Sequence, residues 1–442
     1  MNLRYLCLGI CLLISWACPV EIAAQRMLGS HFVQQGWAAY QTRPAYHSPN
    51  IISVGLLRGY GSATHSGFSY EEVLIPKPES DSFYLDLDGA IEQMGAQNAL
   101  GTDARMDWLT VGISPHSMLG LYVGVSTRQQ NYLTYPKALV GMLWQGNSQW
   151  LGDRFAIAPD FRSLMYHEVA AGLSIKTLSE VSFGFRAKYL NGLSNFESTY
   201  SELLVSTDPQ TYEIGFEADY AVRSSMIRFN SADTSFGYTF APFTSNHGFA
   251  MDFGIEAQLP NDVSISAGFL DLGFINWKQD ARYYHVHGSM NFKGLTVSEL
   301  INQDSATVME IVDSLISQIE FDEGTAVYTT YTQGQLYASM NRKINDFFTA
   351  GGLVHIFRRG PQVSPAFALN GTFHLKDRLN VGLTYSIHDR RYDHVGLSLL
   401  VMAGPVRMFV MSDDVISWLA PYQAQSANFQ FGLEFGFGEV PD

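Results

Sequence analysis

Hydrophobic and polar residues alternate along much of this chain. In residues 247–259, large apolar side chains occupy the odd positions from Phe249, while small or polar ones such as Asp252 occupy the even positions. The same alternation resumes in residues 263–269, after a Pro-Asn-Asp turn. A period of two predicts β-strands, and two such runs across a tight turn predict a hairpin with one apolar and one polar face.

Similar alternating segments recur along the chain and give it an all-β character. They span residues 82–88, 106–114, 120–128, 167–176, 181–190, 212–222, 333–343, 347–357, 366–375, 379–387, 395–403, 406–412 and 427–438. With the hairpin, the total is about 14 to 16 segments of a length that crosses a bilayer at a tilt. Counting back from a periplasmic C-terminus puts the turn at 341–346 in the periplasm and the turn at 260–262 outside the cell, where so short a turn is not expected. Either a strand between 276 and 328 is missing from this series or the assignment there is wrong.

Such strands fit either a soluble sandwich with a wet outer face or a membrane barrel with a wet lumen. Only 16% of the 442 residues are charged and 13% are aromatic, whereas soluble domains carry roughly 25% charged residues. The segment 427–438 also places four phenylalanines on one face, and lipid covers such a face readily. The sequence therefore predicts an antiparallel transmembrane β-barrel, with Phe249 facing lipid and Asp252 facing the lumen.

Residues 1–24 have the pattern of a secretory signal peptide, with one Arg, an apolar core and small residues at the end. The alternative is a lipid anchor at Cys18, but the residues before Cys18 match the anchoring pattern poorly. All three cysteines lie in this segment, so the exported chain has no thiol chemistry. The net charge of −15 argues against binding of nucleic acid, which needs clustered Lys and Arg.

Two segments depart from the strand pattern. Residues 25–80 form no clean series of strands, and we expect them to be a plug-like segment ahead of a barrel formed by residues 81–442. Residues 296–321 carry apolar residues at helical spacing, which predicts a helical insertion that plugs the lumen, caps a mouth, binds a partner or packs on the rim. Ser305 and Ser314 each follow an Asp in this insertion, a pattern that resembles an O-glycosylation signal.

Charged side chains on the polar faces need partners, because a lumen offers limited solvation. We expect these side chains to line the lumen and to pair across its wall: Asp86, Asp88, Arg186, Lys188, Asp219 and Arg223.

Two histidine-containing patterns are candidate sites for chemistry. His285 and His287 share one strand face, as a metal-binding pair would, but two polar residues facing a wet lumen is the favoured interpretation. Residues 388–394 combine His, Asp and Arg, as an outer-membrane protease mouth would, but a solvated loop is favoured. The sequence therefore assigns no catalytic, cofactor-binding or metal-binding residue, and an enzyme is not expected.

Four short motifs carry a family resemblance. They are Thr-Arg-Pro-Ala at 42–45, where Arg43 replaces an Asn; GFRAKYLNG at 184–192; SAGFLDLGFINWK at 266–278; and GPVRMFVMSDDV at 404–415, where Phe409 replaces a Tyr. In these motifs the chain resembles a family of Bacteroidetes outer-membrane proteins of unknown function, distantly similar to the FadL-type long-chain fatty-acid transporters. The resemblance implies a barrel of about 14 strands in the outer membrane.

The leading functional hypothesis is a FadL-like transporter or channel for a hydrophobic or amphipathic small molecule. This hypothesis predicts an apolar pocket formed by plug residues, namely Phe32, Trp37, Ile51, Ile52 and Leu56. The alternative is a barrel that transports nothing and serves as a subunit or scaffold of an envelope secretion or assembly complex. The expected partners are outer-membrane lipid, a hydrophobic ligand and, in the alternative, other envelope proteins.

Overall fold

The computed structural model describes residues 27–77, 82–230, 235–292, 319–359, 362–388 and 391–441. The expected signal peptide, residues 1–24, lies outside this part of the chain. So do residues 296–318 of the expected helical insertion, together with Ser305 and Ser314. Residues 319–321, expected to end that helix, instead begin a strand. None of the described helices is long and apolar enough to cross a membrane.

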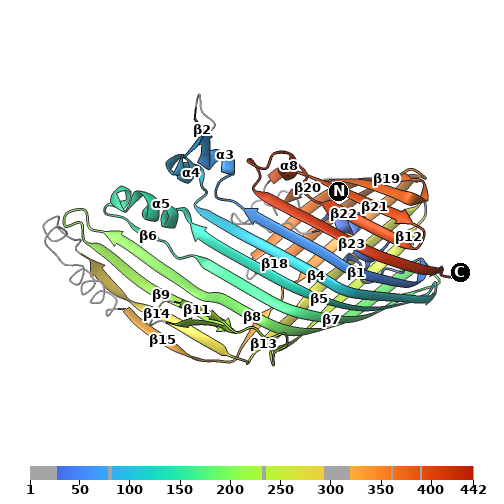
Figure 1. Ribbon diagram of the computed structural model, residues 1–442, viewed down its shortest axis with the longest axis horizontal. Helices are drawn as coiled ribbons and strands as arrows, with labels where there is room; N and C mark the ends of the chain where they lie inside the picture. Colours follow the sequence, from blue (N-terminus) through green and yellow to red (C-terminus); the bar gives the residue numbers. More distant parts are fainter. Residues whose placement is uncertain are drawn as a thin grey trace, which may run out of the picture.

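Within the described residues, a closed antiparallel barrel of 14 strands dominates the molecule (Figure 1). Its strands, in order around the wall, are β1 (Asn50–His65), β4 (Gln97–His116), β5 (Leu119–Pro136), β7 (Asp160–Lys176), β8 (Val181–Thr207), β12 (His247–Leu259), β13 (Val263–Trp277), β17 (Gln335–Asn345), β18 (Phe348–Arg359), β19 (Gln362–Leu375), β20 (Leu379–His388), β21 (Arg391–Ala403), β22 (Val406–Ser412) and β23 (Ser426–Glu439). Strand β1 pairs with β4 on one side and with β23 on the other, where Asn50 lies opposite Glu439. The predicted fold class and strand number are therefore confirmed.

The first barrel strand lies inside the range expected for the plug, so residues 50–65 correct that boundary. Alternation is hard to recognise in β1 because its register with β23 shifts between Leu56 and Gly59, where Leu57 has a φ of 51°. Ile52 and Leu56 are 41% and 39% exposed on the outer wall, and Ile51 belongs to the same strand. Ile52 and Leu56 therefore do not form a pocket with the plug, whereas Ile51 is half-buried on the other face of β1.

The segment 82–88, expected to be a barrel strand, forms a short strand and a helix start outside the barrel. Strand β3 (Phe83–Leu85) pairs with β2 (Leu74–Pro76), and α4 (Leu87–Gln93) follows. Asp86 caps α4 by accepting a hydrogen bond from the Gly89 N–H at 3.0 Å. Asp88 accepts one from Gln145 in α5 (Lys137–Gln145) at 2.8 Å. These two carboxylates therefore do not line the lumen.

The two faces of the β12–β13 hairpin lie as the sequence predicts. Phe249, Met251 and Phe253 are 41% to 45% exposed on the outside, whereas Asp252 is fully buried inside. A bulge interrupts β13, because Leu270 and Asp271 are both buried and the φ of Asp271 is 59°. The bulge brings a second carboxylate to the inside of the barrel.

The assignment of the outer face can be tested with Phe253→Arg. A charge at mid-depth on the lipid side is expected to lower the free energy of unfolding by roughly 2–4 kcal/mol. Urea titration in lipid vesicles measures the effect, with Phe253→Leu as the control that keeps the site apolar. Equal stability of the Arg and Leu variants would place Phe253 away from lipid.

The two ends of the barrel differ in their connections. At one end, which we call the turn end, short turns join the strands, and β23 finishes next to the start of β1. The turn at 260–262 and that at 346–347 are both at this end, so the expectation of opposite sides is wrong. Strand β14 (Ala281–Phe292), which follows β13 in the sequence, does not cross with the barrel. It pairs with β9 (Ile214–Ser225) instead.

At the opposite end, which we call the loop end, the sheet continues beyond the barrel. Strand β8 is 27 residues long, and its second half pairs with β9. Strands β14 and β15 (Ile319–Thr325) extend this external sheet, visible at the lower left of Figure 1. Smaller elements at this end are β6 (Arg154–Ala156), β16 (Tyr328–Tyr331), α3 (Tyr70–Val73), α8 (Ile416–Leu419) and the hairpin β10 (Ile227–Asn230) and β11 (Ser235–Tyr238). Asp219 and Arg223 lie on β9 and therefore belong to the external sheet, not to the expected lumen network.

Candidate functional site: a plug seated on buried charges

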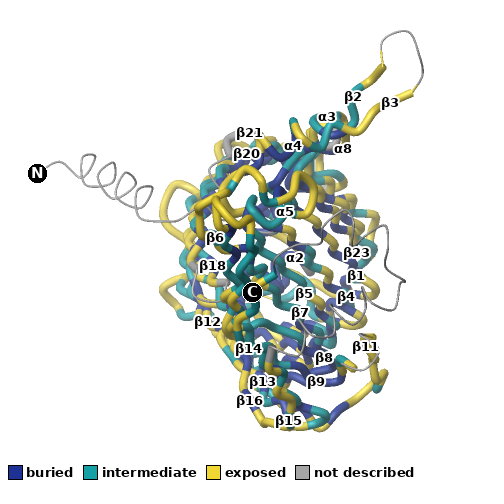
Figure 2. The backbone as a smooth tube through the Cα atoms, turned by 90° about the vertical axis from the view of Figure 1, so that its left-hand side faces the viewer, coloured by how far each residue is buried: buried dark blue, intermediate teal, exposed yellow. Residues whose placement is uncertain are grey.

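Residues 27–49, here called the plug, occupy the lumen. They contain the short helices η1 (Gly29–Phe32) and α2 (Trp37–Thr42), and Figure 2 shows α2 inside the ring of strands. Phe32 is 3% exposed and packs in a cluster with Tyr337 and Leu353 of the wall. Of the five residues expected to form an apolar pocket, Phe32 therefore contacts the inner wall, and Trp37 begins α2.

A continuous network of buried charges lines the half of the wall from β1 to β13. This ion cluster consists of Arg58, Arg105, Asp107, Arg128, Glu168, Arg186, Lys188, Asp252 and Asp271, each at most 9% exposed. The expectation that Arg186 and Lys188 face the lumen and pair there is confirmed. Their partners come from strands that are distant in sequence, so their identity depends on the barrel's register.

Lys188 lies among three carboxylates of the ion cluster. Its Nζ lies 2.5 Å from Asp271 Oδ1, 2.8 Å from Asp252 Oδ2 and 3.8 Å from Glu168 Oε1. Carboxylates from three strands share this ammonium, so its removal would take one cationic partner from each of them.

The guanidinium groups extend the ion cluster to both sides of Lys188. Arg128 Nη1 lies 2.8 Å from Asp271 Oδ2, and its Nε lies 3.5 Å from Glu168 Oε2. Arg105 links Glu168 at 3.5 Å to Asp107 at 2.6 Å. By its definition the ion cluster has five cationic and four anionic side chains, so its formal charge is +1.

The opposite half of the wall, from β17 to β23, is largely neutral and partly apolar on its inner face. Leu353, Ala366 and Ala368 form one buried cluster with the plug, and Phe409 with Met411 belongs to another. The lumen is therefore amphipathic in cross-section, with buried charge on one side and apolar contacts on the other.

Side chains of the ion cluster form hydrogen bonds with the plug. Arg186 donates to the carbonyl oxygen of Tyr40 and, at 3.2 Å, to that of Gln41. These carbonyls belong to the last turn of α2 and need donors from outside the helix. Gln41 in turn donates its amide N–H to Asp107. Displacement of the plug therefore exposes charged groups that already lie in the lumen.

The start of the plug is held by a carboxylate at the loop end. Asp413 accepts hydrogen bonds from the N–H groups of Leu28 at 2.9 Å and Gly29 at 2.8 Å. Burial raises the pKa of Asp413 to about 6, although these two hydrogen bonds oppose the rise. Burial also lowers the pKa of His31 to about 3, so its ring, which packs 4.9 Å from that of Tyr337, is neutral at pH 7.

The motif at 42–45 forms the contact between plug and wall at the turn end. Arg43 Nη1 lies 3.4 Å from Glu256 of β12, and its Nη2 donates to two carbonyl oxygens of the plug. Pro44 lies against Gly184 of β8 and Gly254 of β12, so closely that a Cβ at Gly184 would sit 2.1 Å from the Pro44 carbonyl oxygen. Glycine at these two wall positions lets the plug backbone approach the wall this closely.

Two of the other three motifs pack against each other, and the third contacts the start of the plug. Lys188 from residues 184–192 pairs with Asp271 from residues 266–278. A Cβ at Gly192 would lie 2.6 Å from the Trp277 ring, so these two motifs also pack together. Asp413 of residues 404–415 holds the start of the plug. The four family motifs therefore include part of the plug and several residues of the wall around it.

The two histidine patterns lie away from the ion cluster. His285 and His287 are on β14 in the external sheet, so their favoured assignment to a wet lumen is wrong. In residues 388–394, positions 389 and 390 lie outside the described chain. His388 and His394 are buried with ring centroids 3.9 Å apart, which is unlike the favoured solvated loop. His394 Nδ1 lies 3.5 Å from Asp414.

Two hollows meet at Gln335. An inner cavity of about 50 Å³, the space of one or two water molecules, lies between the plug and the ion cluster and is lined by His31, Gln41, Arg128 and Asp271 among others. A larger groove of about 470 Å³ lies where β13 meets β16, β17 and β18, and its apolar lining includes Phe269, Leu272, Leu336, Ile356 and Val363. Gln335 lines both hollows.

Gln335 is held by hydrogen bonds on the inner side. Its Nε2 donates to Asp271 Oδ2 at 3.0 Å, and its Oε1 lies 3.1 Å from His355 Nε2. Three of the groove's apolar residues, Phe269, Leu272 and Val363, are 46% to 48% exposed. Gln335 therefore lies at the boundary between the outward-facing groove and the buried charges.

Comparison with protein families places most of this chain in one of them. Residues 44–413 match the family of unknown function DUF5723. The chain belongs to this family. Comparison with curated proteins found no match.

Solved β-barrels resemble the DUF5723 chain only distantly. The Pseudomonas putida toluene transporter TodX is 9% identical, with 91% of this chain and 95% of TodX covered and a TM-score of 0.44. A Pseudomonas aeruginosa FadL homologue is 10% identical, with 90% and 94% covered and a TM-score of 0.39. The translocator domain of the autotransporter NalP from Neisseria meningitidis is 8% identical, with 89% and 91% covered and a TM-score of 0.35.

Proposed function

We propose that this DUF5723 protein is an outer-membrane channel that admits an amphipathic, anionic small molecule through its wall and releases it past a displaced plug. The observation that carries the proposal is the position of Gln335, between the apolar groove and the buried ion cluster. In this proposal the turn end faces the periplasm and the loop end faces outward, as in bacterial outer-membrane barrels.

The groove suits the apolar part of such a ligand. Its exposed residues, such as Phe269 and Val363, face the lipid side of the wall, so an apolar chain can leave the membrane without crossing water. Its inner edge is polar, because Thr330 donates to Glu197 at 3.1 Å and Arg162 Nε lies 3.3 Å from the same carboxylate. A ligand with an apolar tail and a polar head matches both parts.

The ion cluster suits an anionic head group. Five of its nine charged side chains are cations, and Arg105 and Arg128 line the inner cavity together with the carboxylates of Asp103 and Asp271. The cavity itself is too small for a head group while the plug is seated. Passage therefore requires the plug to move, which would free the Arg186 donors that now bind the plug's carbonyl groups.

Uptake of radiolabelled dodecanoate tests the proposal in cells that express this protein and lack their own fatty-acid transporter. Gln335→Trp fills the connection between groove and cavity and is expected to reduce uptake at least about tenfold, since one blocked step limits the whole path. Leu383→Trp is the matched control, because Leu383 is 54% exposed on the outer wall of β20 and lies away from the groove.

Two outcomes would contradict the wall route. One is equal uptake by the Gln335→Trp and Leu383→Trp variants. The other is uptake by the wild type no faster than by cells without the protein.

The scaffold alternative has one observation in its favour. Phe236, Tyr238, Phe240 and Phe243 are 50% to 75% exposed near the β10–β11 hairpin, and clustered exposed aromatic residues often mark protein interfaces. Purification from outer membranes in mild detergent, followed by native mass spectrometry, separates the two functions. A stoichiometric protein partner together with absent dodecanoate uptake would favour the scaffold.

A further inference from the structure

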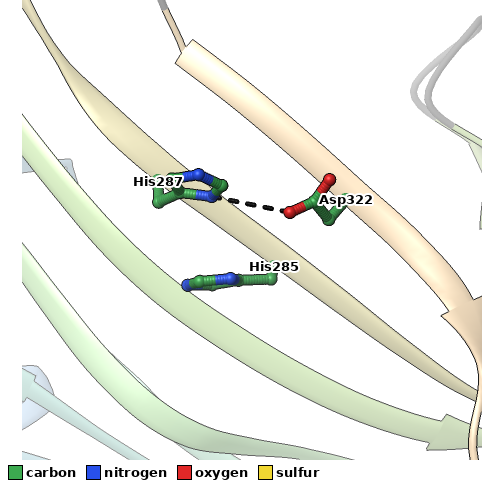
Figure 3. Close-up of side chains that lie close together, drawn as sticks. All are labelled: His285, His287 and Asp322. Atoms are coloured by element: carbon green, nitrogen blue, oxygen red, sulfur yellow. Dashed lines mark ion pairs between the residues drawn. The ribbon is translucent and has the colours of Figure 1, made fainter.

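We propose that His285, His287 and Asp322 form a metal site in the external sheet that binds Zn²⁺ or a similar divalent transition-metal ion. Figure 3 shows the three side chains converging from strands β14 and β15. One ligand atom from each lies within 4.8 Å of the others. Ligands of a tetrahedral Zn²⁺ lie about 3.3 Å apart, given Zn–N and Zn–O bonds of about 2.0–2.2 Å. Small side-chain rotations therefore suffice to close the site.

Strand pairing brings these groups together. His285 and His287 are two residues apart and share one face of β14, with their rings stacked 4.7 Å between centroids. Register places His285 opposite Asp322 of β15, and His287 opposite Asp219 of β9 and Glu320 of β15. The donor set of two imidazoles with carboxylates is typical of sites for zinc and related transition metals.

Carboxylates on both flanks orient the two imidazole rings. His285 Nε2 lies 2.7 Å from Asp219 Oδ1, and His287 Nε2 lies 3.0 Å from Glu320 Oε2. Each contact leaves Nδ1 as the ring nitrogen available to a metal. Such carboxylate–histidine pairs fix the ring orientation and raise ligand basicity in metal sites.

The remaining nitrogen of His287 points to the third ligand. Its Nδ1 is shielded from solvent, has no hydrogen-bond partner among the described residues and lies 3.8 Å from Asp322 Oδ2. A metal ion between these two atoms would satisfy both of them. A direct hydrogen bond at 3.8 Å would not.

The charge of the site also favours a cation. Asp219, Glu320 and Asp322 carry three negative charges, and within the described part of the chain their ion-pair partners are the two histidines, with no Lys or Arg among them. A divalent ion compensates most of these charges and ties β15 to β14.

Calorimetric titration of the detergent-solubilised, full-length protein with ZnCl₂ at pH 7.5, after EDTA treatment, tests the site. We expect one Zn²⁺ per chain for the wild type. The double variant His285→Ala/His287→Ala should lose at least about 100-fold in affinity, and Asp322→Asn about 10-fold or more. His116→Ala is the matched control, because His116 is an exposed histidine at the turn end, and it should bind as the wild type does.

Two further measurements distinguish a built site from loose surface binding. Zn²⁺ should slow amide hydrogen exchange in β15 of the wild type but not of the double variant, and lowering the pH to 5 should release the ion, because protons compete for imidazole. Retention of tight, stoichiometric binding by the double variant would overturn the proposal, as would the absence of stoichiometric binding in the wild type. Heat-modifiable migration on gels confirms that each variant is folded.

Discussion

Gly184→Ala is expected to displace the plug from its seat and open the barrel. The added Cβ would sit 2.1 Å from the carbonyl oxygen of Pro44 and 2.4 Å from the backbone nitrogen of Ala45. Both atoms belong to the plug backbone, so no side-chain rotation relieves the overlap. The wall strand is fixed by its pairing with β7 and β12, and the plug must therefore move.

Conductance in planar bilayers measures this opening. The wild type, with its lumen filled, should conduct little, and the alanine variant should show a conductance at least about tenfold higher, because overlaps of this kind cost about 1–3 kcal/mol and a shift of 1.4 kcal/mol changes a population tenfold. Gly61→Ala is the matched control, since a Cβ at Gly61 meets nothing within 4 Å. A closed Gly184→Ala channel would show that the seat tolerates the side chain or that the plug does not gate the lumen.

Lys188→Met is expected to lower the stability of the barrel by about 3–5 kcal/mol, the usual effect of removing one partner from a buried ion pair. Methionine fills the volume of the lysine stem but leaves Asp252 and Asp271 without their nearest cation. Urea titration in lipid vesicles, followed by tryptophan fluorescence, measures the change in the free energy of unfolding.

Two comparisons separate loss of charge pairing from loss of volume. Lys343→Met removes a 51% exposed lysine that pairs with Asp346, and it should leave stability unchanged, because solvent screens such pairs. Lys188→Met combined with Asp252→Asn removes a charge of each sign and should recover part of the loss. A double variant no more stable than Lys188→Met alone would argue against the pairing assigned here.

The barrel could be predicted from sequence because lipid requires one consistent face. The residues from Phe249 to Phe253 alternate without interruption, and β23 alternates in the same way, so their outer faces were assigned correctly. Strand β1 was missed because the irregularity near Leu57 shifts its pattern. In the segment at 82–88, the capping carboxylate of Asp86 occupies a position that also fits a strand pattern.

Strand β14 shows a different limit of pattern analysis. Its alternation is genuine, but nothing in that alternation distinguishes a strand of the external sheet from one that crosses with the barrel. The pairing of β14 with β9 decides its place, and pairing between distant segments is set by the whole fold. The assignment of His285 and His287 to the lumen failed for this reason.

The sequence predicts that charged side chains face the lumen, but it does not identify all the residues of the ion cluster. Arg186 and Lys188 were expected in the lumen because buried charges need partners. Their partner Asp271 faces inward because of the bulge in β13, which no alternation rule could place. The plug's contacts, such as Asp413 with Leu28, join residues 385 positions apart, and only the closed barrel brings them together.

The seam between β1 and β23 sets the order in which this protein can assemble. Strand β1 can pair on this side only after β23 has been made, because Asn50 lies opposite Glu439. Closure between such distant segments is slow compared with the formation of a local hairpin. Asp413, which anchors the start of the plug, also comes late in the chain. A partly inserted chain therefore presents an unpaired strand edge and an unseated plug at the same time. Both stay exposed until the C-terminal strand has paired with β1.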